Sequence, residues 1–265
     1  MPLPVLFSAR VAESAVPSFS PLSISDCRLW LDGQDAGSFT LDTSGGRTSV
    51  SQWSDKSGGA RHFVQATKAN QPTYEATSAL NSKSALGFVS ANQYMLHAPT
   101  GTDLIQNLAG QTTFIVFRPN ALPSVEGRLI SICQNGTTVQ TLQATTLRST
   151  PAFRVGDKIR GSDVGVVIDA GTPAINTNYV IYHAADAANG DLFSFVNGTA
   201  LGSNTSWQTA GNFENVAHGD VRLGGRLADR WFDGLIAEVV VYGRFLSPTE
   251  RTSVTTALQS KWGMS

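Results

Sequence analysis

The octapeptide Leu-Ile-Ala-Glu-Val-Val-Val-Tyr at residues 235–242 indicates the fold most directly. Its β-branched residues favour an extended strand, and the nearly continuous apolar run is typical of a strand covered on both faces. We therefore expect a central strand of a β-sheet. The run contains a carboxylate, Glu238, which needs a partner if it is buried, and Arg244 or Arg226 is the expected partner.

The segment after this strand carries the signals of a helix. Ser247 can cap the helix N-terminus, Pro248 suits the first helical position, and Glu250 completes a capping box. Gly263 is typical of a helix end. Apolar residues recur between these ends at helical spacing and predict a stripe that packs on the sheet: Val254, Ala257, Leu258 and Trp262.

Upstream of residue 235, short apolar or alternating runs separated by turn signals predict further strands. The clearest turn is Asn197-Gly198, because this dipeptide favours the tight turn of a β-hairpin. No repeat of fixed period is visible, which argues against a solenoid or a propeller. The predicted strands lie at residues 28–32, 50–55, 85–89, 112–117, 128–132, 164–168, 179–183, 192–196 and 199–201.

The composition agrees with an all-β protein. The 265 residues are 41% hydrophobic and 15% charged, with 25 glycines and 11 prolines, which suits one loop-rich sandwich. The net charge of -1 gives no overall attraction for nucleic acid or for an anionic membrane surface. No apolar run approaches the roughly 20 residues that span a bilayer. We expect neither nucleic acid nor membrane as a partner.

The N-terminal residues differ from the rest of the chain. Residues 1–25 have the proline and serine content of an extended arm, and residues 26–265 are expected to form the folded domain. The arm lacks the basic and apolar regions of a secretory signal, so we expect synthesis and folding in a host cytoplasm. Cys27 and Cys133 are far apart in the sequence; two thiols are the simpler expectation, and one disulfide is the alternative.

Three groups of residues, in this order along the chain, together resemble a known family. The chain resembles the laminin-G-like jelly rolls of the concanavalin A-like lectin/glucanase group, found in bacterial and phage structural proteins. The resemblance implies a two-sheet antiparallel sandwich whose relatives bind glycans, calcium or proteins, or serve as adhesion and virion modules. The residues that carry it are 29–32; 50–58 with 71–74; and 232–239 with Tyr242, 246–247 and 261–263.

The sequence lacks the patterns of the common catalytic sites. Glucanases of this fold place their carboxyl groups on one strand as Glu-x-Asp-x-x-Glu, whereas the six glutamates here are scattered singly. No Gly-x-Ser-x-Gly elbow, Walker loop or dinucleotide fingerprint occurs, and the histidines do not have zinc-ligand spacing. We expect a protein that is not an enzyme and has no cofactor. Two acidic loops, 32–35 and 229–233, leave calcium as an alternative.

These observations favour a structural role. The first hypothesis is a phage virion protein, either a head-decoration (cement) protein or a tail-associated one, that docks on capsid or tail subunits. A homo-oligomer is compatible with this role. The predicted contacts with partners are apolar residues of the arm, which has no periodicity of its own: Leu3, Val5, Leu6, Phe7 and Phe19.

The alternative hypothesis is a glycan-binding adhesin that recognises a surface sugar. Sugar sites combine an aromatic ring with polar hydrogen-bonding groups. Trp207 lies between polar residues, and Arg230 precedes Trp231, so these three residues are the candidate ligand-binding residues. A polysaccharide hydrolase or lyase is the third and least favoured alternative, because the paired carboxylates are missing.

Overall fold

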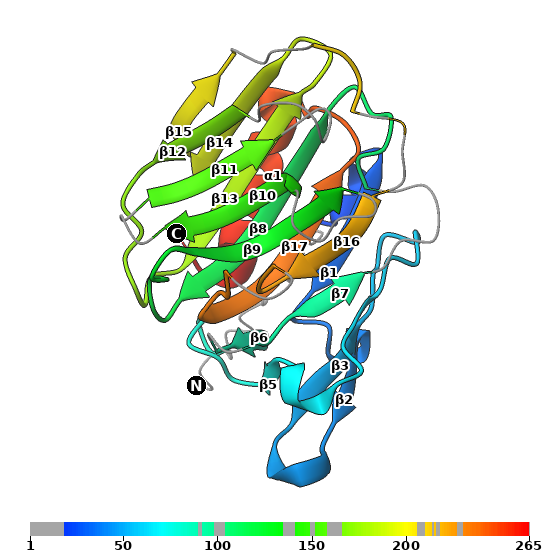
Figure 1. The fold of residues 1–265 in the computed structure, drawn as a ribbon, viewed down its shortest axis with the longest axis vertical. Coiled ribbons are helices and arrows are strands. Elements are labelled where there is room, and N and C mark those ends of the chain that lie inside the picture. Colours follow the sequence, from blue (N-terminus) through cyan, green and yellow to red (C-terminus); the bar gives the residue numbers. More distant parts are fainter. Residues whose placement is uncertain are drawn as a thin grey trace, which may run out of the picture.

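The computed structural model describes residues 19–89, 92–97, 104–134, 141–148, 152–157, 166–205, 210–213, 215, 218–226 and 230–264. In these ranges the chain forms an all-β sandwich of two antiparallel layers, with one α-helix packed outside the back layer (Figure 1). This is the predicted jelly-roll type of fold. Over the same ranges, the structure has no helix with the length and apolar character needed to cross a membrane.

The back layer contains the strand predicted from residues 235–242. This strand, β17, lies between β1 and β8, and every pairing in the layer is antiparallel. The order of strands across the layer is β1 (Cys27–Asp32), β17 (Gly234–Tyr242), β8 (Gln111–Pro119), β13 (Tyr179–Asp186), β14 (Asp191–Val196) and β15 (Thr199–Asn204).

The front layer is a second antiparallel array facing the first. Its middle strands, β16, β9, β10 and β11, are the ones that matter for the functional site below. The order across the layer is β4 (Phe63–Val64), β7 (Met95–His97), β16 (His218–Leu223), β9 (Glu126–Gln134), β10 (Thr141–Arg148), β11 (Ala152–Asp157) and β12 (Val166–Ala170).

Short strands connect the two layers at one side, so hydrogen bonding runs continuously from one layer into the other. The β2–β3 hairpin extends from this side of the molecule (Figure 1). The connecting strands are β2 (Phe39–Asp42), β3 (Ser49–Trp53), β5 (Thr73–Glu75) and β6 (Ala85–Phe88). Four 3-10 turns complete the described elements: Pro21–Ser23, Ala36–Ser38, Ser44–Gly46 and Lys68–Asn70.

Two apolar cores stabilise the fold. The main core lies between the two layers and includes Ile115 and Val239 from the back layer and Ile132 from the front layer. The second core lies between the outer face of the back layer and the helix α1 (Pro248–Trp262). Strand β17 serves both cores because its alternate side chains face opposite sides of the layer, which explains why all nine of its residues are buried.

The local signals in the sequence are confirmed. Asn197 and Gly198 both have positive φ angles, 49° and 81°, as the tight hairpin turn between β14 and β15 requires. Ser247 and Glu250 form the predicted capping box, and Gly263 ends α1 in the left-handed conformation. No disulfide joins Cys27 and Cys133, so both side chains are thiols.

The described part of the predicted arm packs on its own domain. The hydroxyl of Tyr242 donates a hydrogen bond of 3.1 Å to the carbonyl oxygen of Pro21, and Phe19 and Ile24 contact the core under α1. Residues 1–18 lie outside the described residues. The division into an arm and a domain at residue 25 stays a prediction.

A buried histidine links the two layers. The side chain of His183 is fully buried; its Nε2 lies 3.1 Å from Nε2 of Gln111, and its Nδ1 lies 3.2 Å from Oγ1 of Thr145. If Gln111 donates to Nε2, the ring is neutral and Nδ1 carries the proton. Burial lowers the pKa of His183 to about 3.

We expect His183 to make the fold sensitive to acid. The pKa of His183 is lower in the folded protein than in the unfolded chain. The free energy of unfolding is therefore unaffected by His183 above pH 6.5 and decreases as the pH falls toward 3. The loss is about 1.4 kcal/mol per pH unit. Urea unfolding between pH 7 and pH 4 should show this slope in the wild type and a smaller one in His183→Gln. Equal slopes would contradict the assignment.

Candidate functional site

The outer face of the front layer carries a group of arginines. Strand alternation sends Arg222 of β16 outward while Val221 and Leu223 enter the core. On β9, a bulge opposite Thr145 and Thr146 lets Leu129 and Ile130 both enter the core and leaves Arg128 on the outer face, opposite Thr146. Without the bulge, alternation would place Arg128 on the core side of the layer.

Glu126 holds three of these arginines together. Its carboxylate lies 3.7 Å from Nη2 of Arg128 and 3.5 Å from Nη1 of Arg154, and it also accepts a hydrogen bond from Arg230. One negative charge is thus shared among three guanidinium groups. Arg128 is 7% exposed, so this part of the network is largely removed from solvent.

Two further carboxylates complete the network. Asp169 on β12 contacts both Arg148, as an ion pair, and Arg154, at 3.8 Å. Asp220 pairs with Nη2 of Arg222 at 2.6 Å. We call the six basic residues that gather here the arginine face: Arg128, Arg148, Arg154, Arg222, Arg226 and Arg230.

The arginine face has more positive than negative charge. Among the residues whose side chains the structure describes, six guanidinium groups meet three carboxylates. The crowding acts on Arg128: burial, together with the positive charges of Arg226 and Arg230, lowers its pKa to about 10, although Glu126 opposes this shift. A negatively charged ligand would relieve this repulsion.

Arg222 lies over one ring of an aromatic pair. Its guanidinium carbon is 4.7 Å from the centre of the Tyr94 ring, and Tyr94 stacks on Trp231 with 6.1 Å between ring centres. Gly225 makes room for this stack, since a Cβ at that position would lie 2.4 Å from the Trp231 ring. Arg222 is 5% exposed, and its Nε and Nη1 find no hydrogen-bond partner among the described residues.

The structure brings together two of the three predicted ligand-binding residues. Arg230 and Trp231 both belong to the face just described, where Trp231 is half-buried. Trp207 lies outside the described residues, as do Leu3, Val5, Leu6 and Phe7 of the arm. Sequence reasoning missed the remaining arginines and Tyr94, because they come from separate strands and no local pattern joins them.

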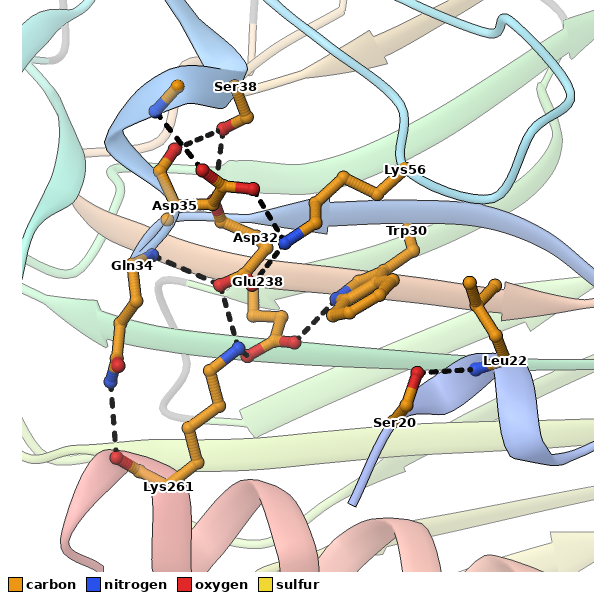
Figure 2. A network of polar contacts seen from close by, with 12 residues as sticks. Ser20, Leu22, Trp30, Asp32, Gln34, Asp35, Ser38, Lys56, Glu238 and Lys261 are labelled. Carbon is orange, nitrogen blue, oxygen red and sulfur yellow. Dashed lines mark hydrogen bonds and ion pairs between the residues drawn. The ribbon is translucent and has the colours of Figure 1, made fainter. Parts of the chain in front are cut away.

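A second polar cluster lies under α1 and corrects one prediction (Figure 2). Glu238 is 1% exposed and accepts hydrogen bonds from the indole nitrogens of Trp30, at 2.8 Å, and Trp262, at 2.7 Å, and pairs with Nζ of Lys261 at 2.8 Å. The prediction that Arg244 or Arg226 is its partner is wrong. Arg244 pairs with the helix-capping Glu250 instead.

Lys261 also joins Glu238 to a second carboxylate, Asp32, which it contacts at 2.7 Å. Burial raises the pKa of Glu238, and Lys261 opposes that rise. Burial alone would raise the pKa of Asp32 as well, but Lys261 and Lys56 outweigh it and lower that pKa. Both carboxylates are buried and neutralised, so they fasten the end of α1 to the sheet rather than face a substrate.

The two carboxylates of the acidic loop at residues 32–35 both form ion pairs with Lys56. Nζ of Lys56 lies 3.0 Å from Asp32 and 2.7 Å from Asp35 (Figure 2). Asp229 of the other acidic loop lies outside the described residues. In the described part of the chain, no three His, Cys, Asp or Glu side chains are grouped as metal ligands.

Comparison with known proteins gives similarity of structure without similarity of sequence. No family model matches the chain, and no curated protein sequence matches it. The sialidase of Trypanosoma rangeli superposes with a TM-score of 0.60 and 15% identity, over 90% of this chain and 33% of that chain. The binding domain of botulinum neurotoxin serotype G superposes with a TM-score of 0.59 and 13% identity, over 88% and 51%.

A smaller domain also matches: the CBM40 of the Ruminococcus gnavus IT-sialidase, bound to alpha2,3 sialyllactose, has a TM-score of 0.47 and 17% identity, over 56% of this chain and 83% of that one. That TM-score is too low to support an argument. This chain spans about half of the toxin domain and a third of the Trypanosoma enzyme. The similarities show the fold alone: a β sandwich, here with an arginine-rich outer face.

Proposed function

We propose that this chain is a non-catalytic carbohydrate-binding module that holds an anionic glycan on the arginine face. The observation that carries the proposal is the position of Arg222. Two nitrogen atoms of this buried cation, Nε and Nη1, have no hydrogen-bond partner among the described residues, and the guanidinium lies over Tyr94, which stacks on Trp231. A carboxylate or sulfate group beside Tyr94 would be attracted to this cation and to the more exposed Arg148 and Arg154, and guanidinium forks suit such groups geometrically.

The aromatic stack favours a sugar as the carrier of the anionic group. Tyr94 and Trp231 are both partly exposed beside the charged residues, and aromatic rings next to polar donors form the usual surface for a sugar ring. Nucleic acid is less well matched. The net charge of -1 gives the chain no overall attraction for a phosphate backbone.

The carboxylates that the structure describes favour binding over catalysis. On the arginine face, Glu126, Asp169 and Asp220 are each engaged by arginine. Asp32 and Glu238 share Lys261 but are buried under α1. The earlier hypothesis of a virion protein with capsid or tail partners stays a prediction, because most of the arm that motivates it lies outside the described residues.

The test is a glycan array that contains sialylated, uronic-acid and sulfated glycans with their neutral parents. Sialosides are included because one structure of similar fold is a sialidase. We expect the chain to bind acidic glycans and not their neutral parents, with signals that fall as salt rises from about 0.05 to about 0.5 M. Binding of neutral glycans alone, or of single-stranded DNA in place of any glycan, would contradict the proposal.

A further inference from the structure

A cleft on the connecting strands faces the same side as the arginine face. The cleft has a volume of about 680 Å³ and is lined by residues of β2, β3 and β4 and their turns, among them Leu41, Gln52 and Val64. Leu41 and Val64 are each 42% exposed, although both are apolar. An exposed apolar floor beside amide and hydroxyl groups is the composition of a ligand-binding surface.

The pairing of strands places the cleft and the arginine face on one continuous surface. Residues directly opposite each other on neighbouring strands project to the same side of a sheet. One row of such partners runs from the cleft through Leu96 to Arg222 and beyond it into β9 and β10. The row consists of Thr40, Gln52, Val64, Leu96, Arg222, Ser131 and Ala144.

The cleft differs from the arginine face in charge. Its acidic residue, Asp42, accepts hydrogen bonds from Ser44 and pairs with Lys68 at 3.0 Å, and these contacts lower the pKa of Asp42 to about 2. The ion pair leaves the cleft close to neutral. Gln52 and Ser51 add amide and hydroxyl groups, which suit the hydroxyls of an uncharged sugar.

The distance between the two regions exceeds the reach of one sugar ring. Strand β3 of the cleft and strand β16 of Arg222 are three strand positions apart, which corresponds to about 14 Å. Val64 and Leu96 form the apolar part of the surface between them. A ligand that uses both regions must therefore be a chain of several sugar units.

We propose that the ligand is an oligosaccharide that lies across β3, β4, β7 and β16, with its acidic unit on the arginine face and neutral units in the cleft. This inference rests on the proposed function and adds the length and the direction of the ligand. The arginine face supplies the charge-dependent part of the binding, and the cleft supplies a part that depends only on chain length.

Calorimetric titration with two pairs of probes tests the inference: N-acetylneuraminic acid with sialyllactose, and glucuronic acid with a hyaluronan tetrasaccharide. We expect the oligosaccharide of at least one pair to bind about 10-fold or more tightly than its acidic monosaccharide, a gain that corresponds to about 1.4 kcal/mol. Val64→Ser should remove most of this gain and leave the affinity for the monosaccharide unchanged. Leu41→Ser is a second variant at an exposed position of the cleft and should act in the same way.

The control is Ile175→Ser, which also replaces an exposed aliphatic side chain with serine. Ile175 is 51% exposed and lies outside the cleft, so the change should leave both affinities unchanged. If the monosaccharide binds but chain length and both cleft variants have no effect, the inference fails and the proposed function stands. If no acidic probe of either length binds, both fail together.

Discussion

Replacing Lys261 with methionine is expected to lower the free energy of unfolding by about 3–5 kcal/mol at pH 7, because removal of one member of a buried ion pair leaves the other charge without compensation. Here one ammonium group serves two buried carboxylates, Glu238 and Asp32. It also fastens the C-terminal turn of α1 to the sheet (Figure 2). Urea unfolding followed by tryptophan fluorescence measures the change.

The loss should depend on pH in a defined direction. Burial raises the pKa of Glu238, and without Lys261 this pKa should rise further. The buried charge of Glu238 therefore lowers the free energy of unfolding of the variant most at high pH. Asp32, whose pKa is lowered, stabilises the wild type only while it is ionised. The difference between the two proteins should therefore shrink as the pH falls toward 4. A difference that grows on acidification, or equals that of the control Lys83→Met, would contradict this account.

Replacing Arg222 with glutamine is expected to weaken the binding of an acidic glycan about 10- to 100-fold, the range that corresponds to one lost hydrogen bond to a charged group. The change removes the cation that lies against Tyr94 and leaves Asp220 without its partner. Binding of the acidic glycan should also become less sensitive to salt. Calorimetric titration measures both effects.

The control is Arg118→Gln, on the face of the back layer that lies away from the arginine face. It should leave the affinity for the glycan unchanged. Because Arg222 is buried, Arg154→Gln provides a second test at a side chain that is 29% exposed. Thermal unfolding of each variant separates a folding defect from a binding defect. Equal affinities for all four proteins, with all four folded, would exclude the arginine face as the site.

The fold could be predicted where its signals are local. The run at residues 235–242, the Asn197-Gly198 turn and the capping box before α1 each depend on neighbouring residues, and each is confirmed. Seven of the described strands were missed, among them β10, β11 and β16 of the front layer. The sequences of β10 and β16 contain many polar residues, because the outer face of the front layer is polar and carries buried arginines.

The candidate site could be predicted only in part. Arg230 and Trp231 were identified because they are adjacent in sequence. Arg128 reaches the same face only through the bulge at Leu129, and such a register shift leaves no mark in the order of residues. The partner of Glu238 was wrong for a related reason: Lys261 is 23 residues away on α1, and the packing of the helix decides which cation reaches the carboxylate.

The most direct test of the central claim is a titration in which only the charge of the ligand changes. Sialyllactose and the hyaluronan tetrasaccharide would each be compared with their carboxyl methyl esters, which keep the sugar framework and remove the negative charge. The account predicts that at least one acidic form binds and that its ester binds about 10-fold more weakly or not at all. An acid and an ester of equal affinity, or no binding by either acidic form, would contradict it.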